Sequence, residues 1–420
     1  MRRVILWSDG IGGSYMMAQS SMNHGDDEEH PAPCPLTFEN YSGFLLLFFT
    51  VLGGLERKLQ LQKKKNIIRI LRILMPIVGI TCFVVFPPWD GIWAWLTPLP
   101  DTVQEQVDDA IGYGLDGIIV YVDEAGKPPA FYSAGWKDRD NQIPADPQSF
   151  FKIGSISKLY VAAATAKLVY HHSLSLDDTL DDYFPELVGR IEYADQITLR
   201  MMLQHRSGIP NYTAQPGFLW DTPPKTDRES LALVLDLPAD FKPGAEYSYS
   251  NTNYLLIREI LDKVVGFDHH QYIKEEILRP LGLSNTFSSI HKVDIDAVMS
   301  GYYVGVASDF KHIDTGMVAT AEDVGIFLRA LNDGSLFNEQ EQAIYSSIYK
   351  YEHTGWVLGY YSIARYHKDI DTVAVQFVNT NGGTPIIPFF DTQGGTKVIV
   401  SNVVYNRIVR ILRKEIHRTQ

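Results

Sequence analysis

The pattern of apolar and polar positions predicts paired strands near both ends of a long folded region. Residues 117–123 and 130–134 are short apolar runs, and the segment 124–129 between them contains Gly126 and two prolines. Two such runs joined by a turn are typical of a β-hairpin. Near the carboxyl end, residues 356–366 and 372–378 have similar runs and are predicted to pair as strands.

Helical spacing dominates between these strand regions. Residues 101–113 have apolar side chains one helical turn apart and predict an amphipathic helix before the hairpin, and residues 407–417 predict a basic closing helix. The middle of the chain, about 155–345, has mainly helical periodicity. We therefore expect an α/β (α+β) fold in which one antiparallel sheet, built from both chain ends and flanked by helices, carries a large mainly helical insertion.

The first hundred residues have a different character. The uncharged run from Ile73 to Trp89 approaches the length that spans a bilayer of ~30 Å, and lysines and arginines precede it. Because positive flanks stay cytoplasmic, residues 66–95 are predicted to be a transmembrane anchor or signal segment, with the rest on the extracytoplasmic side, periplasmic or cell-surface. An earlier span at Tyr41–Leu55 would leave that side unchanged, and a cleaved secretory signal is the alternative. Residues 1–65 are an N-terminal extension without a clear pattern, and 101–420 are expected to form one domain.

The net charge and the cysteine content limit the kinds of partner and metal site that the protein can have. The net charge of −13 argues against a nucleic-acid partner. Cys34 and Cys82 are the two cysteines, and both precede the predicted domain, which therefore has neither a disulfide framework nor a thiolate zinc site. The histidine pairs 171–172 and 269–270 are adjacent in sequence and are expected to diverge on a helix. We expect no metal and no cofactor.

A serine and a lysine three residues apart supply the first candidate chemistry. Ser155 and Lys158 precede the Ala-rich helical run 159–170, so the hydroxyl and the amine should share one face at the start of that helix. A neutral lysine can take the proton of a serine, and the amino end of a helix can stabilise an oxyanion. Taken alone, this pattern also fits an ordinary serine cap followed by a solvated lysine.

The sequence downstream adds a second motif, in which the turn Pro243-Gly244 leads into Tyr249-Ser250-Asn251. Together, Ser155-x-x-Lys158 and Tyr249-x-Asn251 resemble the serine hydrolases that include class C β-lactamases, D-alanyl-D-alanine carboxypeptidases and related esterases. The resemblance covers residues 101–378. Further segments similar to that family are Leu174 to Asp178, Ile197 to Arg200, His205 to Pro210, Pro280 to Leu283 and Ala319 to Asp323.

The resemblance implies a β-lactamase-like fold and a role for each motif residue. Ser155 would be the acylated nucleophile and Lys158 its proton acceptor or electrostatic partner. Tyr249 would carry protons to the leaving group and from water, and Asn251 would orient the substrate and Lys158. A tyrosine acts as a base at neutral pH only if a cation stabilises its phenolate, and Lys158 would be that cation. His205 is expected to be structural.

The family's third motif corresponds to His353-Thr354-Gly355, followed by Gly359-Tyr360. The N–H groups of Trp356 and Ser155 would then form the oxyanion hole. Many relatives have lysine where His353 stands, so the cation that meets a substrate carboxylate is expected to lose its charge as pH rises through neutrality. Residues 379–402 depart from the family by separating the last strand from the closing helix.

The predicted function is that of a serine hydrolase that forms an acyl-enzyme at Ser155. Its expected substrate is a small molecule or peptide with an ester or amide bond, such as a β-lactam, a D-amino-acid peptide or a small ester. The alternative is a catalytically weak penicillin-binding-like receptor or scaffold at the membrane. The sequence specifies neither the physiological substrate nor the oligomeric state.

Overall fold

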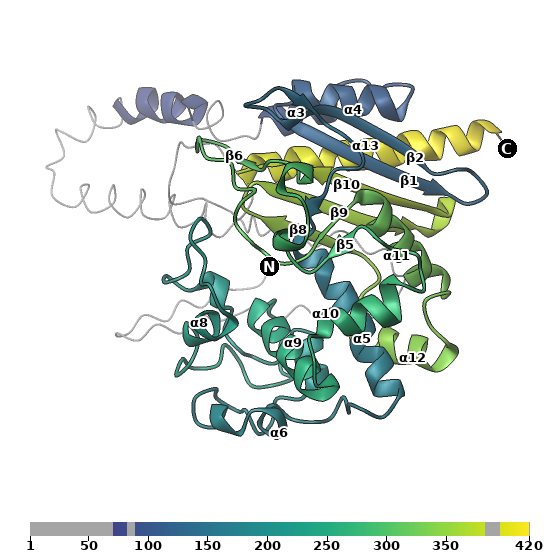
Figure 1. Ribbon diagram of the computed structural model, residues 1–420. Coiled ribbons are helices and arrows are strands. Elements are labelled where there is room, and N and C mark those ends of the chain that lie inside the picture. The colour runs from purple at the N-terminus through teal and green to yellow at the C-terminus, as the bar shows by residue number, and fades with distance from the viewer. Residues whose placement is uncertain (1–69, 82–88, 383–394, 420) are drawn as a thin grey trace, which may run out of the picture. The chain divides into compact units, whose positions relative to one another are not determined.

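The computed structural model describes residues 70–81, 89–382 and 395–419. Its central element is a six-stranded antiparallel sheet (Figure 1). Its strand order is β3-β2-β1-β10-β9-β8. The strands are β1 (Gly117–Glu124), β2 (Ala130–Asp138), β3 (Ile143–Pro144), β8 (His353–Val357), β9 (Tyr360–His367) and β10 (Thr372–Val378).

The two ends of the domain meet in the middle of this sheet. Strand β1 pairs with β2 on one side and with β10 on the other, in a register that runs from Ile118 opposite Val378 to Glu124 opposite Thr372. The predicted hairpin and the predicted assembly of one antiparallel sheet from both chain ends are confirmed.

Helices cover both faces of the sheet (Figure 1). Helices α4 (Val103–Gly112) and α13 (Gly395–Thr419) pack on one face, where buried side chains from both helices join those of β1. Helices α5 (Ser157–Tyr170) and α11 (Ala321–Asp333) belong to the larger core on the other face. Successive side chains along a strand point to opposite faces of the sheet. Neighbouring residues of β1 such as Ile118 and Ile119 therefore belong to different cores.

The region between β2 and β8 contains most of the helices that the structure describes. They are α5, α6 (Leu180–Tyr183), α7 (Leu199–Leu203), α8 (Asp227–Ala232), α9 (Asn251–Val265), α10 (His269–Ile273), α11 and α12 (Glu339–Ile348). Short strands tie this region together: β4 (Phe151–Lys152), β7 (Val318–Ala319) and β5 (Thr286–Phe287) form one small sheet, and β6 (Tyr302–Tyr303) pairs with β11 (Thr380–Asn381).

Two predicted elements have different boundaries in the structure. Residues 356–366, predicted as one strand, are divided between β8 and β9 by a turn at Gly359, whose φ is +84°. The closing helix predicted over 407–417 is the second half of α13, which begins at Gly395. The first half of α13 is rich in valine and isoleucine, which favour strands. Burial of these side chains against the sheet outweighs that preference.

A buried arginine fixes α13 to the chain that enters the domain. The Arg407 guanidinium donates to the carbonyl oxygens of Thr97, at 2.6 Å, and Pro98, at 2.8 Å, and its Nε donates to Gln106 of α4. Nearer the start of α13, Lys397 forms an ion pair of 2.7 Å with Asp90 of helix α3 (Trp89–Leu96). The closing helix therefore holds the entry segment in place.

The predicted anchor is described only in part. Residues 70–81 are helical, whereas residues 82–88 and the alternative span Tyr41–Leu55 lie outside the described residues. Within the described ranges, none of the helices combines the length and the apolar character that crossing a membrane requires.

Candidate active site

Ser155 lies in a short 3₁₀ turn, η1 (Gly154–Ile156), which leads directly into α5. Lys158 is in the first turn of α5, and its Nζ is 3.0 Å from Ser155 Oγ. The spacing of three residues thus brings the amine to the hydroxyl as predicted, because residues three apart on a helix are neighbours. This pair provides a hydroxyl with a basic group beside it.

The second motif reaches the same point from α9. The hydroxyl of Tyr249, two residues before the first residue of α9, is 2.7 Å from Ser155 Oγ. Asn251 is that first residue, and its Oδ1 accepts a hydrogen bond of 2.9 Å from Lys158 Nζ. The four residues singled out from the two motifs therefore form one connected network, although more than 90 positions separate the motifs.

Burial sets the protonation states in this network. Lys158 is 7% exposed, and burial, followed by the charges of Arg258 and Lys350, lowers the pKa of its ammonium to about 7. Burial raises the pKa of the Tyr249 phenol, although its hydrogen bond with Ser155 acts in the opposite direction. These shifts favour a neutral amine beside a protonated phenol. A neutral amine suits Lys158 as the proton acceptor, the first of the two roles considered for it, and the phenolate that Tyr249 needs to act as a base is not the favoured form of the resting site.

Asn211 and Thr213, which the motifs did not reveal, and the buried His205 hold Tyr249 and Asn251 in place. Asn211 Oδ1 accepts from the backbone N–H of Asn251 at 3.0 Å, and Thr213 Oγ1 accepts from its side-chain amide at 3.1 Å. The ring of His205 is buried 4.4 Å from that of Tyr249, and burial lowers the pKa of this imidazole to about 3. This placement matches the structural role predicted for His205.

Strand β8 lies directly against the turn that carries the nucleophile. A Cβ built on Gly355 would lie 2.0 Å from the carbonyl oxygen of Ile153, and one built on Gly154 would lie 3.1 Å from the backbone nitrogen of Trp356. The contact at Gly355 excludes a Cβ, and the positive φ of Gly154, +53°, disfavours a side chain there. The third motif therefore stands beside Ser155, with the backbone nitrogen of Trp356 next to the turn, where an oxyanion hole requires a donor.

His353 is placed differently from the expectation of a substrate-facing cation. Its side chain is 6% exposed, Nε2 is 2.9 Å from the hydroxyl of Tyr349, and Nδ1 contacts the carbonyl oxygen of Thr354. Burial and the charges of Lys350 and Lys158 hold the pKa of this imidazole well below its usual range. The neutral ring uses both nitrogens within the protein, so the structure does not support His353 as a pH-dependent cation for a substrate carboxylate.

One histidine pair also departs from its prediction. The rings of His269 and His270 do not diverge, since their centroids are 4.0 Å apart. With Asp268 they form a group whose ligand atoms lie within 4.8 Å of one another, a spacing compatible with a metal ion. His269 Nδ1 is 2.8 Å from Asp262, and Asp268 is the amino-terminal cap of α10, so each contact also has an ordinary structural explanation.

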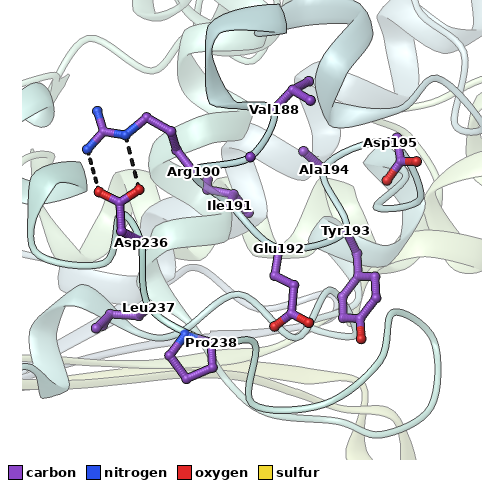
Figure 2. Close-up of a pocket in the computed structure, with 11 residues that line it drawn as sticks. Val188, Arg190, Ile191, Glu192, Tyr193, Ala194, Asp195, Asp236, Leu237 and Pro238 are labelled. Carbon is purple, nitrogen blue, oxygen red and sulfur yellow. Dashed lines mark hydrogen bonds and ion pairs between the residues drawn. The ribbon is translucent and has the colours of Figure 1, made fainter.

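A surface recess of about 410 Å³ lies outside the two motifs (Figure 2). It is lined by residues 188–195 and 236–238, among which Arg190 and Asp236 form an ion pair of 2.7 Å. Since Ser155, Lys158, Tyr249 and Asn251 are not among its lining residues, the recess is separate from the candidate site.

The fold and the site together define a class of protein. An antiparallel sheet carries a helical insertion, and together they bring Ser-x-x-Lys, Tyr-x-Asn and a glycine-containing edge strand to one point. Serine hydrolases related to penicillin-binding proteins have this arrangement. The sequence model of the family described as Beta-lactamase matches residues 99–347, more than half of the chain. The protein belongs to this family.

Known proteins agree with that assignment. The chain is 28% identical over 196 residues to Protein flp of Staphylococcus aureus strain MW2, covering 45% of this chain and 39% of that protein. It is 27% identical over 192 residues to penicillin-binding protein 4* of Bacillus subtilis strain 168, covering 44% and 42%. The matched part thus spans about two fifths of these relatives. The D-amino acid amidase of Ochrobactrum anthropi SV3 has a similar fold, with a TM-score of 0.64, 21% identity and coverage of 74% of this chain and 98% of that one.

Proposed function

We propose that the protein is a serine hydrolase that cleaves an ester or amide bond through an acyl-enzyme at Ser155. The observation that carries this proposal is the position of Ser155 Oγ, 3.0 Å from Lys158 Nζ and 2.7 Å from the hydroxyl of Tyr249. A nucleophile between a buried amine and a buried phenol has a group to accept its proton and a second group to donate one. The similarity to an amidase and to penicillin-binding proteins supports the choice of bond.

Acylation begins with the neutral form of Lys158. As Ser155 Oγ attacks the carbonyl carbon, its proton moves to Lys158 Nζ, and the N–H groups of Ser155 and Trp356 stabilise the oxyanion. Tyr249 gives its proton to the leaving group when the ester or amide bond breaks. The acyl-enzyme then contains a lysine cation near a phenolate, and their attraction offsets the cost of two buried charges.

Deacylation reverses these transfers. The Tyr249 phenolate takes a proton from water, whose oxygen attacks the acyl carbon, and Ser155 recovers its proton from Lys158 as the product acid leaves. Both groups return to their neutral forms, so the proton balance closes over one turnover. We therefore assign the ion pair between the Lys158 cation and the Tyr249 phenolate to the acyl-enzyme, where Tyr249 acts as the base.

Covalent labelling tests the proposal. The full chain is incubated with a fluorescent fluorophosphonate and, separately, with a fluorescent penicillin, and the labelled residue is identified by mass spectrometry. We expect the fluorophosphonate on Ser155 and no label on Ser155→Ala, whose thermal midpoint should stay close to that of the wild type because one hydroxyl adds little packing. An unlabelled wild type, together with no turnover of an activated ester, would favour the catalytically weak receptor or scaffold instead. Ser157→Ala is the matched control.

We also propose that residues 66–95 attach the chain to a membrane, with the catalytic part on the extracytoplasmic side. Basic residues precede this segment, and Trp93, Trp95 and Leu96 of α3 are 61%, 66% and 57% exposed, as suits side chains at a lipid interface. A protease added to intact spheroplasts that express the full chain should digest residues after Pro100. Protection of those residues until the cells are lysed would contradict this orientation.

A further inference from the structure

Four aromatic rings form a continuous row beside the candidate site. Tyr212 contacts Phe218, Phe218 contacts Trp220, and Trp220 contacts Trp356, with ring centroids 5.5, 4.9 and 4.6 Å apart. Each contact is edge-to-face, with interplanar angles of 67°, 81° and 87°. We call these four residues the aromatic row.

Both ends of the aromatic row are attached to residues of the site. At one end, Asn211 and Thr213, which flank Tyr212, hold the backbone and the side chain of Asn251. At the other end, Trp356 follows Gly355, and its backbone nitrogen lies next to the turn of Ser155. The segment from Asn211 to Trp220 therefore extends from the neighbour of Lys158 to the proposed oxyanion donor.

The row is aromatic and is only partly covered. All four of its rings are half-buried. Tyr247, close enough to influence the pKa of Tyr249, adds a further aromatic side chain that is 62% exposed. Another aromatic group can pack on partly exposed rings in an edge-to-face or offset-stacked arrangement.

We propose that the aromatic row is the subsite for an aromatic acyl group, so that preferred substrates are esters or amides of arylacetic or similar aromatic acids. This inference rests on the proposed hydrolase function. Tyr249 donates to the leaving group, so the leaving group lies on the side of the phenol, and the oxyanion lies at Trp356. The acyl substituent then extends along the remaining side, where Trp220 packs on Trp356.

Two esters with the same leaving group isolate this subsite. We compare kcat/KM for 4-nitrophenyl phenylacetate with that for 4-nitrophenyl acetate, using the full chain. The ratio cancels the contributions of Ser155, Lys158 and Tyr249, which both substrates need equally. We expect the wild type to prefer the phenylacetate and Trp220→Ala to lower the ratio about tenfold, the loss expected for one aromatic contact and its buried area. Trp220→Phe, which keeps a ring, should retain most of the preference.

Leu219→Ala is the matched control, because Leu219 is an exposed apolar side chain of the same segment, and its ratio should equal that of the wild type. If Trp220→Ala lowers kcat/KM for both esters equally, the row only supports the fold of the segment, and the subsite is wrong. The same conclusion follows if the wild type turns over both esters with no preference. If the wild type hydrolyses neither ester and takes no label at Ser155, the proposed function itself fails. A thermal melt of each variant shows whether it is folded. If Trp220→Ala does not fold, the ratio of the two kcat/KM values is compared between the wild type and Trp220→Phe.

Discussion

The Nε2 atom of His353 lies 2.9 Å from the hydroxyl of Tyr349, within a buried group of aromatic side chains. Tyr349 also packs against Tyr254, whose ring centroid is 5.4 Å away, and Nζ of Lys158 lies 5.4 Å from the ring centroid of Tyr254. The third-motif histidine is thus connected to the lysine of the first motif through aromatic side chains. It supports the site from inside the protein.

This relationship changes the expected pH dependence of substrate preference. Because the pKa of His353 is held well below its usual range, the ring is already neutral at about pH 6 and stays neutral to about pH 8. The ratio of kcat/KM for a carboxylate-bearing ester to that for a neutral ester should therefore be constant over this range. A ratio that falls steeply between these pH values would show that His353 titrates there and faces the substrate.

The titration of Lys158 should appear in the activity itself. The proposed base works as a free amine, and burial lowers its pKa to about 7, so kcat/KM should rise with pH through about 7. The positive charge of Lys350 contributes to that lowering. Lys350→Gln should therefore raise the pKa of Lys158 and move the acidic limb of the pH profile to higher pH. Lys127→Gln, in the β1–β2 turn, is the matched control, and equal profiles for all three proteins would contradict the assignment of this limb to Lys158.

Removing either proton-transfer group should slow turnover without unfolding the protein. Lys158→Ala and Tyr249→Phe should each lower kcat by about 10² or more, the usual contribution of a positioned acid or base. Tyr247→Phe is the control for Tyr249, since this neighbouring tyrosine is 62% exposed. Steady-state kinetics on an activated ester measures the effect. A variant with near-normal turnover would take that residue out of the mechanism.

The Arg407 contacts should contribute strongly to stability. Replacing Arg407 with methionine keeps most of the apolar volume but leaves the carbonyl oxygens of Thr97 and Pro98 without their donor. We expect the free energy of unfolding to fall by about 3 kcal/mol, since hydrogen bonds from a charged group are worth ~1.5 to 3 kcal/mol each. Arg410→Met, at an exposed position of the same helix, should change it by less than about 0.5 kcal/mol. Equal denaturation midpoints for the two variants would contradict the role given to Arg407.

A chelator should leave activity unchanged. The group of Asp268, His269 and His270 has the spacing of metal ligands, but its hydrogen bonds are made within the group and with Asp262. The proposed chemistry uses only protein side chains and water. Activity after dialysis against EDTA should equal that of untreated protein, and His270→Ala should behave in the same way. Loss of activity in EDTA that zinc restores would show that a metal takes part.

The sequence predicted the features that depend on short spacing or on strong local signals. The hairpin at Gly126 follows from turn chemistry, and the contact between Ser155 and Lys158 follows from helix geometry. The meeting of Tyr249 with Ser155 came from a family resemblance, because no local rule joins residues that far apart. Tertiary packing determined the remaining features.

His353 shows why that packing was not predictable from the motif. A histidine next to Thr354 and Gly355 has the same local sequence whether it faces solvent or the core. Its protonation depends on Tyr349, which reaches it from the loop after α12, and on burial by distant segments. Similarly, the first half of α13 has the valine-rich composition of a strand, and its helical form depends on the sheet face that it covers.

The pairing of β1 with β10 also has a consequence for biosynthesis. The partner of Ile118 is Val378, and β2 ends at Asp138, so the ribosome must translate about 240 further residues before the hairpin of β1 and β2 gains its second neighbour. During that interval the nascent chain exposes an unpaired strand edge rich in isoleucine and valine, the kind of surface that promotes aggregation. Truncated transcripts that end before Thr372 should therefore yield insoluble polypeptide, and a chaperone that shields the hairpin during translation should increase the amount of native protein.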